Sequence, residues 1–138
     1  MIVQLNGALT TDRFGNLNSA VLFSSGYGTV PPGIYFDPAK GGFTIMTWQK
    51  ISAYGDFPAI IDFGNGALSD NIMFYFVGTT GTNRLYVLNV GSGPYGDFTS
   101  QVNIGVWTHV AVSVSGSLAT FYRNGSASGT MSGIVFIF

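Results

Sequence analysis

Apolar residues recur along this chain mostly at every second position, in short runs bounded by Gly, Pro, Asn and Ser. A period of two is the pattern of a half-buried β-strand, and the 20 Gly and 5 Pro interrupt any helical period. The pattern predicts an antiparallel β-sandwich with essentially no helix. The predicted strands span residues 20–23, 33–36, 43–51, 59–63, 72–77, 84–90, 101–104, 107–114, 119–123 and 134–138.

Turn sequences separate the clearest of these strands. Ser115-Gly116-Ser117 lies between the strands at 107–114 and 119–123. Asn124-Gly125 follows the second strand and is typical of a type I′ hairpin turn, in which both central residues need positive φ. The chain therefore predicts a local β-hairpin here.

Both tryptophans lie within apolar strands, where an indole buries a large area and its N–H needs one partner. We expect core packing for both, with a ligand platform as the alternative. The residues expected to be largely buried are Trp48, Trp107, Ile45, Val110 and Val112. The single His109 has no Cys, second His or carboxylate near it in sequence, which favours a structural role over metal binding or base catalysis.

The composition narrows the classes of partner. Of the 138 residues, 46% are hydrophobic but only 8% are charged, against about 25% in typical domains, so the surface must be uncharged and polar. The five Lys and Arg are scattered, which argues against nucleic acid. No apolar run approaches the ~20 residues that cross a bilayer, so we expect no membrane insertion. Such a surface favours an extracellular or surface-exposed location, on a cell, a filament or a virion.

Three ordered motifs carry a family resemblance. Trp107-Thr108-His109-Val110-Ala111 leads to Tyr122-Arg123-Asn124-Gly125, and upstream stand Phe43-Thr44-Ile45 with Trp48 and Lys50, and Ala20-Val21-Leu22-Phe23 before Gly26-Tyr27. The set resembles the laminin G-like domains of the concanavalin A-like lectin/glucanase superfamily. The resemblance implies a jelly-roll sandwich that binds or builds more often than it catalyses.

The carboxylates argue against an enzyme. The chain has six Asp and no Glu, and the Asp residues are isolated at positions 12, 37, 56, 62, 70 and 97. Glycosidases need two carboxylates that face one sugar, and those of this superfamily place them two and four residues apart on one strand. No Gly-x-Ser-x-Gly elbow is present either. We expect no catalytic residues and no enzymatic activity.

A repeated tetrapeptide gives the candidate ligand-binding residues. Tyr54-Gly55-Asp56-Phe57 and Tyr95-Gly96-Asp97-Phe98 share one sequence, and each lies beside a Pro. A tyrosine ring stacks on the C–H face of a pyranose and an aspartate accepts hydrogen bonds from its hydroxyls. Read as loops, Tyr54, Asp56, Tyr95 and Asp97 are glycan-binding candidates, and Tyr27 between two glycines is a third aromatic candidate. The alternative is a turn plugged by aromatic side chains.

Two further sites are suggested by asparagine and aspartate. Asp62, Asn65 and Asp70 supply side-chain oxygens within a short stretch, which suits Ca2+, although Asx residues around glycine also form turns. The resemblance adds that superfamily members often hold Ca2+ at a sandwich rim. Asn124-Gly125-Ser126 matches the N-glycosylation sequon, and the same Asn-Gly is explained by a turn alone.

We expect one jelly-roll domain over residues 1–138. Relatives continue for several strands beyond the Tyr-x-Asn-Gly hairpin, whereas here a short apolar segment, 134–138, ends the sequence. Three explanations of this short end remain open: a fragment, a shortened fold, or a strand exchanged with a neighbour. We expect self-association or contact with neighbouring domains.

The expected function is a non-catalytic module that recognises glycans or a glycosylated surface. The alternative is a structural subunit of a filament, coat or virion.

Overall fold

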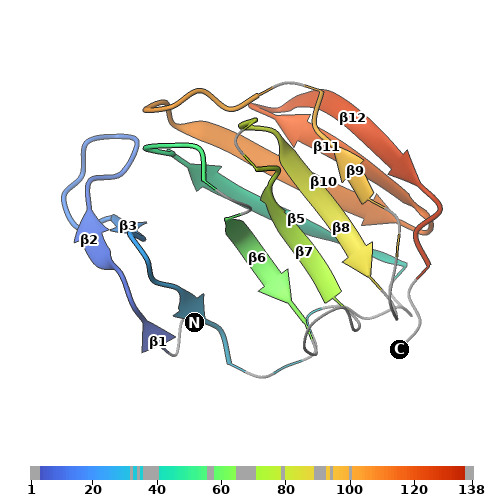
Figure 1. The fold of residues 1–138 in the computed structure, drawn as a ribbon, viewed down its shortest axis with the longest axis horizontal. Helices are drawn as coiled ribbons and strands as arrows, with labels where there is room; N and C mark the ends of the chain where they lie inside the picture. Colours follow the sequence, from blue (N-terminus) through green and yellow to red (C-terminus); the bar gives the residue numbers. More distant parts are fainter. Residues whose placement is uncertain are drawn as a thin grey trace. The chain divides into compact units, whose positions relative to one another are not determined.

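The computed structural model describes residues 4–31, 33, 35, 41–55, 58–64, 71–78, 80–88, 93, 95–99 and 101–135. These residues form strands, turns and loops, and the described part contains no helix (Figure 1). The described residues therefore include no helix that is long and apolar enough to cross a membrane. The predicted all-β class with antiparallel sheets is confirmed. The chain divides into two compact units, Met1–Tyr35 and Phe36–Phe138.

The first unit consists of two short antiparallel ribbons. Its strands pair as β1 (Gln4–Leu5) with β4 (Gly28–Thr29), and β2 (Ala8–Thr10) with β3 (Ala20–Leu22). Asp12 organises the loop between β2 and β3, because its Oδ1 accepts the amide N–H of Phe14 at 2.8 Å and that of Asn16 at 2.9 Å. This is the local hydrogen bonding by which Asp favours turns.

One sheet of the second unit, sheet I, has the strand order β12-β11-β10-β5. Its strands are β5 (Gly42–Gln49), β10 (Thr108–Ser115), β11 (Leu118–Arg123) and β12 (Ser126–Ser132). The β11–β12 turn has φ of 48° at Asn124 and 83° at Gly125. Both values are positive, as a type I′ turn requires, which confirms the predicted hairpin turn.

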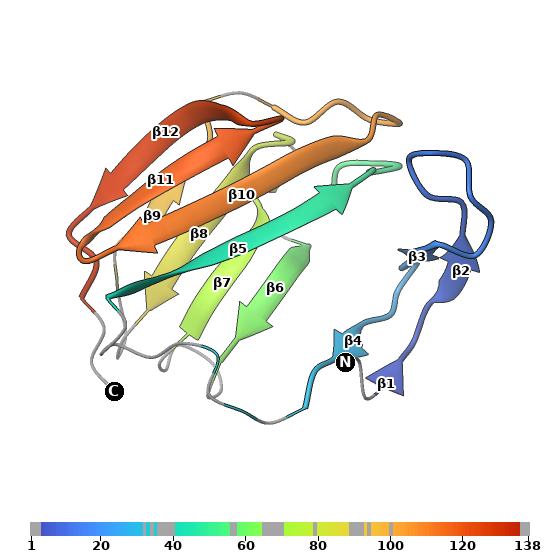
Figure 2. The same ribbon diagram turned by 180° about the vertical axis from the view of Figure 1, so that it is seen from behind.

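The other sheet, sheet II, has the order β6-β7-β8-β9. Its strands are β6 (Ala59–Phe63), β7 (Asn71–Phe76), β8 (Asn83–Leu88) and β9 (Tyr95–Asp97). Within the second unit the two sheets stack face to face (Figures 1 and 2).

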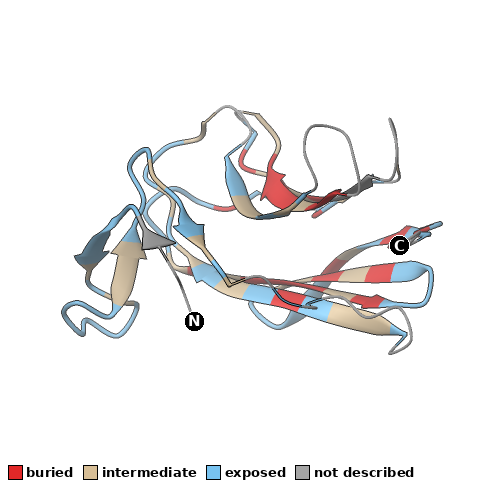
Figure 3. Ribbon diagram, turned by 90° about the horizontal axis from the view of Figure 1, so that it is seen from below, coloured by how far each residue is buried: buried red, intermediate tan, exposed pale blue. Residues whose placement is uncertain are grey.

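The core lies between sheets I and II, and buried residues occur in both layers (Figure 3). In β10, for example, alternate residues point into the core. Val110, Val112 and Phe121 from sheet I meet Phe74 and Leu85 from sheet II, and all five are fully buried. The period-two pattern of the sequence produces this arrangement, because successive side chains of a strand point to opposite faces.

The core predictions were right for three residues and wrong for Trp48. Ile45, Val110 and Val112 are buried as expected. Trp48 is 42% exposed, because it alternates with Ile45 and Thr47 and lies on the outer face of β5. Trp107 is partly exposed, just before β10 begins.

Three predicted strands differ from the structure. Residues 101–104 form no strand; instead Val102 is buried, and its N–H donates to the Gly81 carbonyl at 2.8 Å. In 134–138 the described residues Ile134 and Val135 lie outside any strand, although Ile134 packs in the core. In 33–36 the described residues, Gly33 and Tyr35, are not in a strand.

Candidate functional site

The second copy of the repeated tetrapeptide lies on a strand, so its prediction as a loop was wrong. Tyr95, Gly96 and Asp97 form β9, at the edge of sheet II. Gly96 and Phe98 point inward, since Phe98 is buried and a Cβ at Gly96 would lie 3.0 Å from the Phe121 ring. Tyr95 and Asp97 are both exposed, on the outer face.

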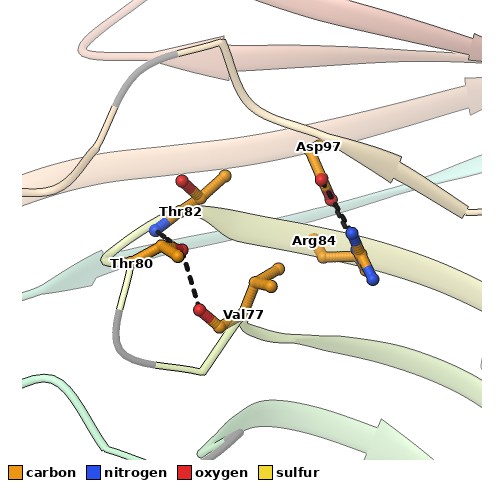
Figure 4. Close-up of polar contacts among 5 residues, drawn as sticks. All are labelled: Val77, Thr80, Thr82, Arg84 and Asp97. Carbon is orange, nitrogen blue, oxygen red and sulfur yellow. Dashed lines mark hydrogen bonds and ion pairs between the residues drawn. The ribbon is translucent and has the colours of Figure 1, made fainter.

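Asp97 forms a two-point ion pair with Arg84 of the neighbouring strand β8. The guanidinium Nε lies 2.5 Å from Oδ1 and Nη2 lies 2.8 Å from Oδ2. Figure 4 shows the two side chains facing each other across the strands. Sheet pairing explains their meeting, because Arg84 and Asp97 are register partners. Their side chains are 21% and 38% exposed, so both remain accessible to a ligand.

Arg84 has further partners on this face. Its guanidinium carbon lies 4.0 Å from the centroid of the Tyr95 ring, a cation–π contact. The pKa of Arg84 is raised above its ordinary value, first by the hydrogen bond to Asp97 and also by one to Tyr75. Tyr75 is the register partner of Arg84 on β7 and is 8% exposed. Arg84 is therefore charged and fixed between three side chains.

This group of residues, Tyr75, Arg84, Tyr95 and Asp97, is called the Arg84 cluster below. It joins a donor, an acceptor and an aromatic ring. Guanidinium has five N–H groups and a carboxylate about four acceptor positions, so the two bonds of the pair leave others for a ligand. Tyr95 packs against the guanidinium and is 57% exposed, so part of its side chain is accessible to a ligand. The paired charges cancel, which suits a neutral ligand with adjacent hydroxyls.

A family model covers most of the chain. The model described as the concanavalin A-like lectin/glucanases superfamily matches residues 23–135. The chain belongs to this superfamily. The resemblance predicted from the three sequence motifs is thereby confirmed. No curated protein and no solved structure gives a significant match.

Sequence reasoning missed two members of the cluster within this superfamily fold. Arg84 is a lone charge in an otherwise uncharged strand, alternating with the inward Leu85, and that alternation is a signal for an outward position. Its pairing with Asp97 depends on the β8–β9 register, which the sequence did not specify. Tyr75 gave no separate signal, because it lies in a continuous apolar strand.

The first copy of the tetrapeptide has a different environment. Tyr54 is partly buried, and its hydroxyl donates to the Val102 carbonyl at 3.0 Å. Its ring covers Gly81, where a Cβ would lie 2.8 Å from the Tyr54 Cζ. Tyr54 therefore packs within the second unit rather than presenting a free ring. Asp56 lies outside the described residues.

Tyr27 and Asn124 occupy exposed positions. Tyr27 is 60% exposed and belongs to the first unit, so it is described apart from the Arg84 cluster. Asn124 lies in the β11–β12 turn, where its Oδ1 accepts the His109 N–H at 2.9 Å. An N-linked glycan attaches to the amide nitrogen and leaves this oxygen available. Glycosylation of Asn124 stays a prediction.

Of the predicted calcium ligands, the structure describes Asp62; Asn65 and Asp70 lie outside the described residues. Asp62 is exposed on β6. Asp62 and Asn71 both lie beside Gly64, since a Cβ at Gly64 would lie 3.1 Å from Asp62 Oδ1 and 2.6 Å from Asn71 Nδ2. Among the described residues no three His, Cys, Asp or Glu gather into a metal-binding group. Calcium binding stays a prediction.

Proposed function

We propose that the chain is a non-catalytic recognition module that binds a neutral glycan, or a glycosylated surface, through the Arg84 cluster. The observation that supports this proposal is the Arg84–Asp97 pair beside the exposed Tyr95 ring. Hydroxyls on adjacent sugar carbons donate to the carboxylate and accept from the guanidinium, while the pyranose stacks on the ring. Membership of the superfamily supports a carbohydrate-binding type of fold.

The absence of catalysis is part of the same proposal. In sheet II the described carboxylates are Asp62 on β6 and Asp97 on β9, with β7 and β8 between them. Three inter-strand spacings of ~4.8 Å place these strands ~14 Å apart. Glycosidases hold their two carboxyl groups about 5 to 9.5 Å apart. This spacing supports binding without hydrolysis. The low fraction of charged residues, 8%, is the feature that favours an extracellular or other exposed location.

A glycan array tests the proposal, with the protein applied at high density in the presence and absence of Ca2+. We expect neutral glycans to be bound by the wild type, and the signal to be lost in Tyr95→Ala. Tyr27→Ala is the matched control, because Tyr27 is equally exposed and belongs to the other unit. Absence of any bound glycan would contradict the proposal.

The alternative is a structural subunit whose faces contact copies of itself or other parts of a coat or filament. A specific observation favours it: the outer face of sheet I exposes Met46 and Trp48, and the only Asp, Glu, Lys or Arg in its four strands is Arg123. If the array shows no bound glycan and the protein assembles in solution, the structural-subunit function is favoured over glycan recognition.

A further inference from the structure

Asp97 occupies the edge of the Arg84 guanidinium that suits a carboxylate best. Arginine binds carboxylates most strongly through two parallel N–H···O bonds. Asp97 already accepts both, from Nε at 2.5 Å and from Nη2 at 2.8 Å. Because the two residues are register partners of β8 and β9, the pairing of the strands holds their side chains opposite each other. A carboxylate of a ligand would have to displace Asp97 from this edge.

The other sides of Arg84 offer an anion no better position. Tyr75, its register partner on β7, hydrogen-bonds it, and the guanidinium carbon lies 4.0 Å from the centroid of the Tyr95 ring. A ligand carboxylate on a remaining N–H group would lie near the Asp97 carboxylate, and like charges repel. Sugar hydroxyls meet no such repulsion, and they can donate to the carboxylate and accept from the guanidinium.

The charge of sheet II acts in the same direction. Within its four described strands the charged residues are Arg84, Asp62 and Asp97, one cation and two carboxylates. One positive and two negative charges leave these strands with a net charge of −1, which disfavours the approach of an anion. Removal of the Asp97 charge would leave the strands neutral and Arg84 without its counter-ion.

We infer that Asp97 determines which glycans this site accepts: it admits neutral sugars and excludes sugars that carry a carboxylate, such as uronic acids. The inference rests on the proposed function and deepens it, because it names the class of glycan that the Arg84 cluster rejects and the residue that rejects it. Asp97 has two effects on a ligand. Its oxygens accept hydrogen bonds from hydroxyls, and its charge keeps the guanidinium from binding another carboxylate.

The test uses two probes that differ at one carbon: methyl glucoside, which has a hydroxymethyl group at C6, and methyl glucuronide, which has a carboxylate there. Each is titrated into the full 15N-labelled chain while the Arg84 Nε–H signal is followed by NMR. In Asp97→Asn the guanidinium has no anionic partner. We expect this variant to bind the glucuronide about fivefold more tightly than the wild type does, and the gain to shrink as the salt concentration rises.

Asp12→Asn is the matched control, because it makes the same change of side chain and of net charge in the other unit of the chain. It should bind the glucuronide as weakly as the wild type. Asp97→Ala is a second test variant, which removes the carboxylate without adding an amide and should show the same gain as Asp97→Asn. The dispersion of signals in the same spectra shows whether each variant is folded.

Equal glucuronide affinity in the wild type and both Asp97 variants would overturn the inference. An equal gain in Asp12→Asn would overturn it as well, because the effect would then belong to the net charge of the chain. A titration with sodium acetate separates this result from the proposed function. If the glycan array is empty and acetate binds Asp97→Asn as tightly as the glucuronide does, the exclusion of carboxylates by Asp97 stands and the glycan function alone fails.

Discussion

Gly96 of β9 lies so close to Met131 of β12 that no side chain fits between them: a Cβ at position 96 would be 2.6 Å from the Met131 Cβ. Sheets I and II meet along this seam, where the Thr99 N–H also donates to the Ser128 carbonyl at 2.9 Å. Glycine is therefore required in the second tetrapeptide for packing. The same closeness fixes β9 and holds Tyr95 and Asp97 on the outer face.

The Gly96→Ala variant tests this seam. The extra methyl group must displace Met131 and the Phe121 ring, and overpacking of this kind costs about 1 to 3 kcal/mol in the free energy of unfolding. Urea denaturation measures the loss. Gly55→Ala is the control from the equivalent position of the first tetrapeptide, where a Cβ would lie an ordinary 3.6 Å from Pro58. Equal stability of the two variants would contradict the account of the seam.

Tyr54 is expected to act in stability and not in binding. Tyr54→Phe removes the hydrogen bond from its hydroxyl to the Val102 carbonyl, which should lower the free energy of unfolding by about 0.5 to 1.5 kcal/mol. Tyr27→Phe, at an exposed position, should change it by less than about 0.5 kcal/mol. Glycan affinity should be the same in both variants. A Tyr54→Phe protein of wild-type stability with weakened glycan binding would assign the residue to the ligand site instead.

The two indoles should differ in their access to solvent. Trp48 is 42% exposed on the outer face of β5, whereas Trp107 is only partly exposed. Acrylamide should therefore quench the fluorescence of Trp107→Phe, which retains Trp48, more strongly than that of Trp48→Phe. The reverse order would show that Trp48 is the more protected indole.

The β2–β3 loop should respond to acid. The side-chain amide of Asn16, followed by backbone N–H groups, hydrogen-bonds the Asp12 carboxylate and lowers its pKa below the ordinary value. Because the folded pKa is the lower one, this stabilisation is present above about pH 4 and is lost as the pH falls through the folded pKa. In an NMR titration the amide signals of Phe14 and Asn16 should move at that lower pH. Signals that move only at the ordinary aspartate pKa would contradict a hydrogen-bonded carboxylate.

The sequence predicted strands well where apolar residues alternate and poorly where pairing alone creates them. β12 has the sequence SASGTMS, which is nearly free of apolar residues, and it forms because the Asn124-Gly125 turn folds it back onto β11. β9 was missed because three residues give no measurable period. Met131 and Gly96, one from each of these strands, then meet at the seam.

The candidate site was only partly predictable for a related reason. Tyr95 and Asp97 could be chosen by their chemistry, and their spacing of two places them on one face of a strand. Arg84 joins them through the register of β8 and β9, a long-range property that no local pattern encodes. Trp48 was misplaced because an indole in an apolar strand fits either face, and only its alternation with the buried Ile45 decides between them.

The most direct test of the proposed glycan site is an NMR titration of the 15N-labelled wild-type chain with the neutral glycan that gives the strongest array signal. We expect the largest shifts at the backbone amides of Tyr95, Asp97 and Arg84 and at the Arg84 Nε–H, and their loss in Tyr95→Ala. Shifts confined to Trp48 and His109 on sheet I would contradict the account, as would the absence of any shift at a saturating glycan concentration.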